Sequence, residues 1–268
     1  MSWKYPVIIL MLCAFTTCGI TAEGQVELTQ SADIRLSPPI AQYASTLFAD
    51  SAALSFLPGH PGSQVRYTLD GSDPRPASPV FEVKKYFTSS TLIKAASFHP
   101  DFQSSDFVEI DFVKVPEVLG VKSINLLTAP NVQYKGEGAA SLIDLKKGGL
   151  NFRDPVWMGF SEGKAEIEIY FTAPRNVKKV IVSTMVDQGS WIFLPAKIVV
   201  ETDAGRFDML TDSPEAAAPE QLSYEGIHFG EVKTQRLRIR IESLAEIPGW
   251  HPGAGNIPWF FIDEIVVE

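Results

Sequence analysis

Short segments in which apolar and polar residues alternate, separated by turn residues, run along most of the chain, and no segment shows helical periodicity. The clearest alternation lies at 164–170, where Ala165, Ile167 and Ile169 share one face and the residues between them share the other. The pattern therefore predicts an all-β protein. Strands are expected at 53–56, 64–69, 91–98, 107–113, 123–127, 163–171, 178–184, 197–201, 236–241 and 260–267.

The last of these strands follows a loop rich in proline and glycine at 248–259, which carries Trp250, His251 and Trp259. Proline stiffens such a loop and glycine permits its tight turns, so the loop is expected to be a rigid aromatic platform. Strict alternation along 260–267 would place Asp263 and Glu264 on opposite faces of the strand.

The N-terminal residues 1–22 have the layout of a secretory signal, with Lys4 before a short apolar run and small residues after it. Two outcomes are open for Cys18. The tract at 15–19 resembles a bacterial lipoprotein box, in which Cys18 would be lipidated and would anchor the protein to a membrane. Cleavage after Ala22 would instead discard it. Either outcome implies an exported protein that is periplasmic, outer-membrane-anchored or extracellular in a bacterium.

Charge and cysteine content narrow the function classes. Both cysteines, Cys13 and Cys18, lie in the leader, so neither a disulfide framework nor a cysteine metal site is expected in the mature chain. The formal net charge is −9 and no basic stripe is present, which makes nucleic acid an unexpected partner. A proline-containing joint near 116–120 divides the mature chain into two predicted domains, 27–116 and 121–268.

The first domain carries the motif YTLDGSDP from Tyr67, followed by Ser78-Pro79 and, from Thr91, by TLIKA. With these motifs, residues 36–115 resemble the chitobiase/β-hexosaminidase C-terminal domain, which is also called fibronectin-III-associated. The resemblance implies a small immunoglobulin-like sandwich with an accessory role beside glycosidases. Asp70 and Asp73 are interpreted as turn-capping residues.

The second domain carries three blocks, NFRDPVWMGF at 151–160, GSWIFLPAKIVVETDAGRF at 189–207 and GWHPGAGNIPWFFIDEI at 249–265. In this order they resemble the discoidin-type (F5/8 type C) module that follows the chitobiase C-terminal domain in bacterial β-N-acetylhexosaminidases. The resemblance implies a jelly-roll sandwich with a ligand site in loops at one end. Many such modules hold a structural calcium at an Asp-Gly pair in the first loop. Here the pair is Asp144-Leu145, which weakens that implication; no cofactor is required.

A sugar site needs aromatic faces for the pyranose ring and polar groups for its hydroxyls. Trp191 lies in an apolar run and is expected in the core or between the domains. The expected ligand-binding residues are Trp157, Trp250, His251, Trp259, Arg153, Asp154 and Asn151.

Catalysis is not expected. The catalytic barrel of the hexosaminidases is absent from this chain, as are the Gly-x-Ser-x-Gly and His-Glu-x-x-His motifs. Asp263 and Glu264, as neighbours on a strand, cannot form the facing carboxylate pair of a glycosidase. The sequence thus predicts a non-catalytic carbohydrate-binding accessory protein. The family analogy suggests glycans that contain N-acetylhexosamine. The alternative is a structural spacer or protein–protein interaction module without sugar binding.

Overall fold

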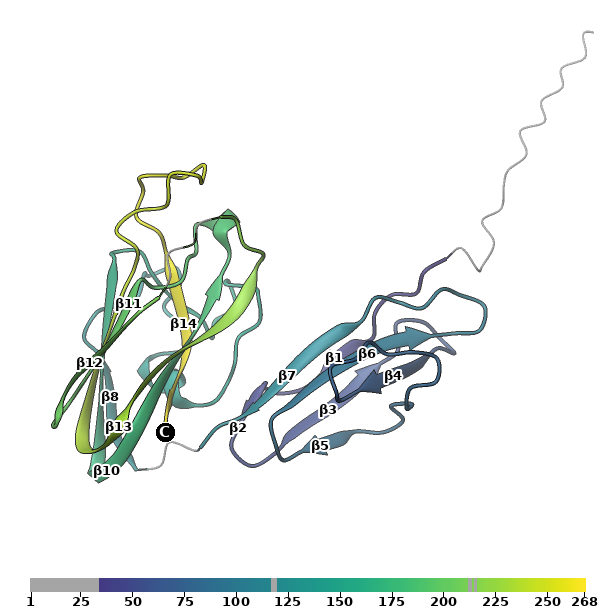
Figure 1. The fold of residues 1–268 in the computed structure, drawn as a ribbon, viewed down its shortest axis with the longest axis horizontal. Coiled ribbons are helices and arrows are strands. Elements are labelled where there is room, and N and C mark those ends of the chain that lie inside the picture. The colour runs from purple at the N-terminus through teal and green to yellow at the C-terminus, as the bar shows by residue number, and fades with distance from the viewer. Residues whose placement is uncertain (1–33, 117–119, 212–213, 215) are drawn as a thin grey trace, which may run out of the picture.

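The computed structural model describes residues 34–116, 120–211, 214 and 216–268. The predicted leader, including Cys18, lies outside the described residues. The described residues form two β-sandwiches that lie one after the other along an elongated molecule (Figure 1). The all-β prediction is therefore confirmed. Among these residues, no helix has the length and apolar character needed to span a bilayer.

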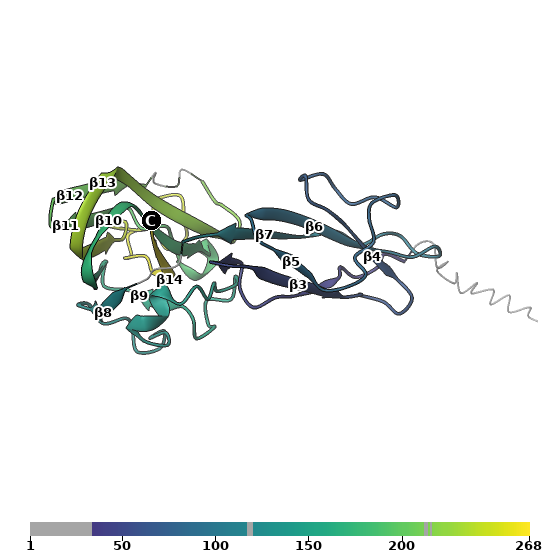
Figure 2. The same ribbon diagram turned by 90° about the horizontal axis from the view of Figure 1, so that it is seen from below.

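The first sandwich packs two sheets against each other (Figure 2). One has the order β1-β3-β5 and the other the order β2-β7-β6-β4. Alternation along the strands buries one residue in two, as in β4 and β6, where Val65, Ile93 and Ala95 face the core. The strands are β1 (Ile40–Gln42), β2 (Leu47–Phe48), β3 (Ala52–Leu57), β4 (Gln64–Thr68), β5 (Lys85–Phe87), β6 (Thr91–Phe98) and β7 (Val108–Lys114).

The second sandwich is built around two long antiparallel strands that pass through both of its layers. The sequence pattern suggested separate strands at 163–171 and 178–184, but they form one strand, β10, which pairs with β13 along most of its length. Register shifts between Tyr170 and Arg175, and again between Val177 and Lys179, bend β10 from one layer into the other. The strands are β8 (Val121–Leu126), β9 (Met158–Phe160), β10 (Lys164–Val186), β11 (Lys197–Thr202), β12 (Gly205–Leu210), β13 (Gln221–Glu242) and β14 (Phe260–Val267).

The two layers enclose the main hydrophobic core. The first half of β10 pairs with β8 and with the end of β13, which also pairs with β11. The second half of β10 pairs with the start of β13 and with β14, and β9 continues that layer. The short 3₁₀-helices η2 (Ala139–Ile143) and η3 (Gln188–Ser190) lie in the connecting loops.

Strict alternation does not hold along β14. The register between β10 and β14 shifts so that Ser183 lies opposite Glu264 while Thr184 lies opposite Ile262, which leaves Asp263 as the extra residue of a β-bulge. The bulge lets Ile262 and Ile265 both face the main core. Because the residues on either side of the pair face the same core, Asp263 and Glu264 do not alternate between two faces, and both side chains are buried. The prediction that they lie on opposite faces of a regular strand is therefore wrong.

The outer face of the layer that contains β14 is also covered. Toward the loop end, Trp157 packs over Met185 and Phe261. Toward the other end, Leu47 and Val115 of the first sandwich pack against Ile181 and Val266. The two sandwiches therefore share an apolar interface.

Candidate functional site

The loop 248–259 projects from one end of the second sandwich, drawn in yellow at the top of Figure 1. Two backbone hydrogen bonds close its base, from Ile247 N to Asn256 O at 2.7 Å and from Gly255 N to Ile247 O at 3.1 Å. The loop is therefore tied down at its base, as its proline and glycine content predicts. It contacts η3 through His251 and Gln188, and it contacts Pro214 through Trp250.

Trp250 and His251 use their polar atoms to hold this loop in place. The Trp250 Nε1–H donates to the Pro214 carbonyl at 3.0 Å. His251 Nδ1 accepts from Gly253 N at 3.0 Å, so its Nε2 must carry the proton that it donates to the Gln188 carbonyl at 3.0 Å. With its ring edge fixed by neighbouring backbone, His251 orients the loop, while Trp250 leaves 38% of its surface exposed.

Trp191 is exposed, and the prediction that it belongs to the core or to the domain interface is wrong. The indole is 39% exposed, and Trp191 itself adopts the left-handed conformation with φ 64° at the end of η3. The buried Gly253 lies against this ring: a Cβ at that position would be 2.8 Å from Trp191 Cε2. The apolar run around Trp191 contributes Ile192 and Phe193 to the interior, while the left-handed turn directs Trp191 outward.

A shallow depression of about 120 Å³ lies beside the same loops. Tyr134, Phe152 and Trp259 supply its aromatic lining, together with Gln133 and Ser190. The ring of Tyr134 meets that of Trp259 edge-on, with centroids 5.5 Å apart. Trp259 is bound by its backbone to Trp191, since Trp259 N donates to Trp191 O at 2.9 Å. The depression and the exposed tryptophans thus belong to one end of the sandwich.

The turn 151–154 contributes one free polar group to this region. Asn151 Nδ2 donates to Asp154 Oδ1 at 2.6 Å, and Asn151 Oδ1 accepts from Arg153 N at 3.2 Å, so the Asn151 and Asp154 side chains stabilise the turn itself. The Arg153 guanidinium stacks over the Phe152 ring at 4.3 Å and is exposed. Arg153 is therefore the residue of this turn that can meet a ligand at the depression.

Trp157 does not belong to any ligand surface. It is 1% exposed and lies beneath the loop 148–157, and its Nε1–H donates to Gly149 O at 3.0 Å. A Cβ on Gly148 would come within 2.5 Å of the indole, so only glycine allows the backbone to pass over the ring. The expectation that Trp157 stacks on a sugar is wrong because the charged turn that precedes it folds the indole inward.

A buried ion pair lies next to Trp157. Lys147 Nζ is 2.8 Å from Asp263 Oδ2 and 4.2 Å from the centre of the Trp157 ring, and both charged side chains are almost fully enclosed. Asp263 Oδ2 also accepts from Gly148 N at 2.6 Å. Burial lowers the pKa of Lys147 and raises that of Asp263, each against the attraction of its partner. Removing either partner would leave a buried charge uncompensated.

Glu264 is the most unusual polar group in the second sandwich. Its carboxylate is buried, and neither oxygen accepts a hydrogen bond of ordinary geometry, although the backbone near Leu145 and Ile265 lowers its pKa somewhat. Burial first, and then the Asp144 and Asp263 carboxylates, raise the pKa of Glu264 to about 9. Glu264 is therefore protonated at neutral pH unless a cation binds to it.

These residues fit a calcium ion in chemical type. Ca²⁺ takes oxygen ligands, and Glu264 offers two unpartnered carboxylate oxygens near Asp144. Leu145, which replaces the glycine of the resembling modules, still adopts the left-handed backbone of glycine, with φ 61°. Within the described part of the chain, no three acidic or histidine side chains gather around one point, so backbone carbonyls would have to complete the shell.

Sequence reasoning missed two residues at this end of the sandwich. Trp191 was assigned to the interior because its neighbours are apolar, and Tyr134 was not considered because it lies outside the three blocks of the resemblance. The Gly189-Ser190 pair before Trp191 was a usable signal, since small residues of this kind mark a turn that can expose the next side chain.

Residues 44–109 match the sequence model of the family described as Chitobiase/beta-hexosaminidase C-terminal domain. A search of curated proteins found no match. Among solved structures, the chain is similar to a Ruminococcus gnavus GH29 fucosidase in complex with fucose, with 12% identity and a TM-score of 0.30. The match covers 55% of this chain and 25% of the fucosidase, so the chain spans a quarter of that enzyme's length.

Two smaller proteins are also similar. A fucose binding module of Streptococcus pneumoniae is 14% identical with a TM-score of 0.36, over 55% of this chain and 93% of the module. The module CBM32-3 from a family 31 glycoside hydrolase of Clostridium perfringens is 16% identical with a TM-score of 0.35, over 56% of this chain and 92% of the module. The family match spans the YTLDGSDP and TLIKA motifs and confirms the resemblance that they indicate.

Proposed function

We propose that the chain is a non-catalytic carbohydrate-binding protein whose second sandwich binds glycans through the aromatic loops at its end. The observation that carries the proposal is the pair of exposed indoles, Trp191 and Trp250, held in place by hydrogen bonds to neighbouring backbone. Rings that are fixed before a ligand arrives lose little conformational entropy on binding, which favours recognition of a weakly bound sugar.

Polar groups for the sugar hydroxyls lie close to these rings. Gln133 and Ser190 line the depression together with Tyr134 and Trp259, and Arg153 stacks on Phe152, which also lines it. A pyranose that stacks on one ring could therefore donate and accept hydrogen bonds at its edge. The N-acetylhexosamine-containing glycans that the family analogy suggests are the first ligands to test.

The test is a glycan array, followed by titration of the mature protein with the glycans that bind and with N-acetylglucosamine oligomers, monitored by tryptophan fluorescence. We expect dissociation constants of roughly micromolar to millimolar. Trp250→Ala and Trp191→Ala should each weaken binding about fivefold or more, because each removes an aromatic contact. Tyr86→Ala, which removes an exposed ring from the first sandwich, is the matched control and should leave binding unchanged.

The alternative is a spacer that binds no sugar. Absence of any glycan-dependent signal across the array, together with unchanged fluorescence behaviour of the Trp250 variant, would favour the spacer and reject the proposal. Neither proposal includes catalysis, because Asp263 and Glu264 are buried at a bulge, where they cannot flank a glycosidic bond.

We also propose that Glu264 and Asp144 would hold a structural calcium ion. The ion would neutralise the buried Glu264 carboxylate and join the loop around Leu145 to β14. Calcium should then raise the melting temperature of the protein but not that of Glu264→Gln, which keeps the shape of the side chain and loses the charge. An equal rise in both proteins would reject this site.

We propose that the protein is exported and that a diacylglycerol on Cys18 tethers it to a membrane surface. Mass spectrometry of the protein from the membrane fraction should show the acyl modification on Cys18. A free N-terminus near Glu23 would instead show that the leader had been removed, and with it the anchor.

A further inference from the structure

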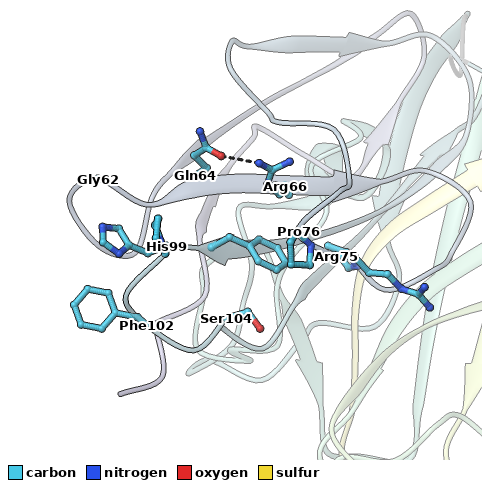
Figure 3. A pocket seen from close by; sticks show the side chains of 11 residues that line it. Gly62, Gln64, Arg66, Arg75, Pro76, His99, Phe102 and Ser104 are labelled. Atoms are coloured by element: carbon cyan, nitrogen blue, oxygen red, sulfur yellow. Dashed lines mark hydrogen bonds between the residues drawn. The ribbon is translucent and has the colours of Figure 1, made fainter. Parts of the chain in front are cut away.

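The first sandwich carries a groove of about 670 Å³ at the end remote from the second sandwich. This volume lies within the range of small-molecule sites, about 300–1,000 Å³. The position follows from the topology: β7 ends at Lys114, near the junction, so its antiparallel neighbour β6 ends at the far side with Phe98. Figure 3 shows the groove between the strand that carries Gln64 and Arg66 and the loops that carry Pro76 and Phe102.

The floor of the groove is the outer face of the sheet. On β4 the core residue is Val65, so Gln64 and Arg66 face outward, and Gln64 lies opposite Phe98 on β6. Phe98 is a half-buried ring on a face that faces solvent. It therefore offers an apolar surface inside a polar groove.

Aromatic rings form one end of the groove. His99 and Phe102 line it, with their ring centroids 5.0 Å apart. His60, which does not line the groove, contacts both rings, with centroids 5.8 Å from His99 and 4.9 Å from Phe102. Pro74 and Pro76 border the other end. These rings form a stiff, flat-walled site of the kind that suits cyclic ligands.

The charge in the groove is positive, although the chain as a whole has a formal net charge of −9. Arg66 and Arg75 line it, and no acidic residue among those that the structure describes does. Of the carboxylates closest in sequence, Asp73 pairs with Lys94 at 3.1 Å, away from the groove lining. The Asp101 carboxylate lies beside the groove, with Oδ2 3.8 Å from His99 Nδ1, but does not line it. The two arginines would attract an anionic ligand to this groove, although the protein as a whole is acidic.

The two arginines are arranged for different tasks. Arg66 donates to Ser78 O at 2.6 Å and to Gln64 Oε1 at 2.8 Å, so its guanidinium is fixed over the groove. Arg75 is exposed, and its guanidinium makes no ion pair or hydrogen bond with the described residues. Its backbone is held by Ser78, whose Oγ accepts from Arg75 N at 2.9 Å. Arg75 is thus a free cation on a fixed turn, suited to pair with a carboxylate.

An extended peptide is disfavoured as the ligand. A peptide that binds a sandwich usually adds a strand to an open sheet edge. The edge of β4 is already covered, because Tyr67 N donates to Pro79 O at 3.1 Å and Phe81 N donates to Val65 O at 2.8 Å. The ligand must therefore be recognised by side chains alone, through ring faces, amide and hydroxyl groups and a carboxylate partner.

We propose that this groove is a second carbohydrate site, which binds oligosaccharides that carry carboxylate groups. The pyranose rings would pack on Phe98 and Phe102, while a sugar carboxylate would pair with Arg75. This site lies on the first sandwich and does not depend on the site proposed for the second. It gives a binding role to a domain whose family resemblance implies only an accessory one.

The test uses the full mature chain labelled with ¹⁵N, titrated with trigalacturonic acid, a hyaluronan tetrasaccharide and 3′-sialyllactose. At least one of these should shift the amide signals of Gly62 and Ser104, which border the groove. Arg75→Glu should weaken that binding about tenfold or more, since it removes a charge-assisted hydrogen bond and adds a repulsive charge. Lys122→Glu is the matched control, because it also replaces an exposed cation by an anion but lies on the second sandwich. It should leave the binding unchanged.

Neutral galactotriose and a hexaglutamate peptide complete the set of probes. The proposal is overturned if none of the three acidic saccharides shifts the Gly62 and Ser104 signals, if either additional probe shifts them equally, or if Arg75→Glu retains full affinity. Trp250→Ala separates the two sites: it should leave these shifts intact, and their loss in that variant would assign the binding to the second sandwich instead.

Discussion

Trp157 and Trp250 show how one residue type takes opposite roles within a single domain. Trp157 is 1% exposed and packs on Phe261 and Met185, whereas Trp250 is 38% exposed and contacts neighbouring loops. Trp157→Ala should therefore lower the free energy of unfolding by about 3–5 kcal/mol, because it opens a large cavity beside a buried charge. Trp250→Ala should cost about 1 kcal/mol or less. Urea unfolding of both variants measures the difference, and equal losses would contradict this assignment.

The same pair shows what single-residue reasoning can and cannot supply. The loop composition around Trp250 was enough to predict an exposed ring, because proline and glycine are local signals. The surroundings of Trp157 are set by residues distant in the sequence: Met185 and Phe261 form the surface on which it packs. A charged turn before a tryptophan does not reveal that surface, so the Trp157 prediction failed.

Glu264 should make stability depend on pH in a direction opposite to that of an ordinary surface carboxylate. Its pKa is about 9 in the folded state against 4.5 for an ordinary glutamate side chain, so the folded state binds a proton that the unfolded state releases. Its contribution is fully present below pH 4.5 and is lost progressively as the pH rises through about 9. The free energy of unfolding should fall by up to about 1.4 kcal/mol per pH unit within this window.

The measurement is urea unfolding between pH 5.5 and 8.5 in buffer with a chelator. Glu264→Gln should flatten the slope, while Glu246→Gln, which changes an exposed residue, should leave it as in the natural chain. Burial also raises the pKa of Asp263 and lowers that of Lys147, so a residual slope in the Glu264 variant belongs to that ion pair. A Glu264 variant with an unchanged slope would show that the carboxylate is ionised and solvated.

At the scale of elements, the alternation of apolar and polar residues indicated where strands lie but not where they begin and end. The run at 164–170 alternates because one of its faces meets the core, and the structure places β10 there. The second half of β10 is almost entirely buried on both faces, from Val180 to Val186, so it carries no alternation to detect. The bulge at Asp263 was equally invisible, since it depends on pairing with Ser183 and Thr184 across the sheet.

Gly253 provides a test of the loop 248–259 as a preformed element. A Cβ at Gly253 would lie 2.8 Å from Trp191 Cε2, so Gly253→Ala must displace the indole. We expect a changed near-ultraviolet circular dichroism spectrum and about fivefold weaker binding of any glycan that the array identifies, since one stacking contact is lost. Gly249→Ala is the matched control, because nothing lies within 4 Å of its added methyl group. Identical behaviour of the two variants would show that Trp191 does not rely on Gly253 for its position.

At the scale of the whole molecule, the two sandwiches meet through a small set of specific contacts. Ser45 in the first sandwich donates its hydroxyl to Leu145 O at 2.6 Å and accepts from Lys147 N at 3.0 Å. Leu145 also joins the apolar cluster between the domains, which explains why a non-glycine residue occupies a left-handed position there. The loop that contacts the first sandwich thus also contains Lys147, which pairs with Asp263.

This arrangement could not be predicted from the sequence, because Ser45 and Leu145 are 100 positions apart and no local pattern indicates that they meet. A fixed junction would hold the two proposed sugar sites, the groove of the first sandwich and the loops of the second, at a constant separation. Two weak sugar sites at a constant separation can bind one long glycan far more tightly than either site alone. A flexible junction would lose part of that gain.

Ser45→Ala tests the junction directly. It removes a hydroxyl that makes three hydrogen bonds, the third from Leu47 N at 3.0 Å, and leaves Leu145 O and Lys147 N without this partner. The expected cost is about 1–3 kcal/mol, confined to the interface. Residual dipolar couplings of the two sandwiches should fit a single alignment tensor in the natural chain and two different tensors in the variant. Ser55→Ala, which removes only a weak 3.4 Å bond to Gln42, is the control. If both variants fit one tensor, the apolar cluster alone fixes the domains and the serine is dispensable.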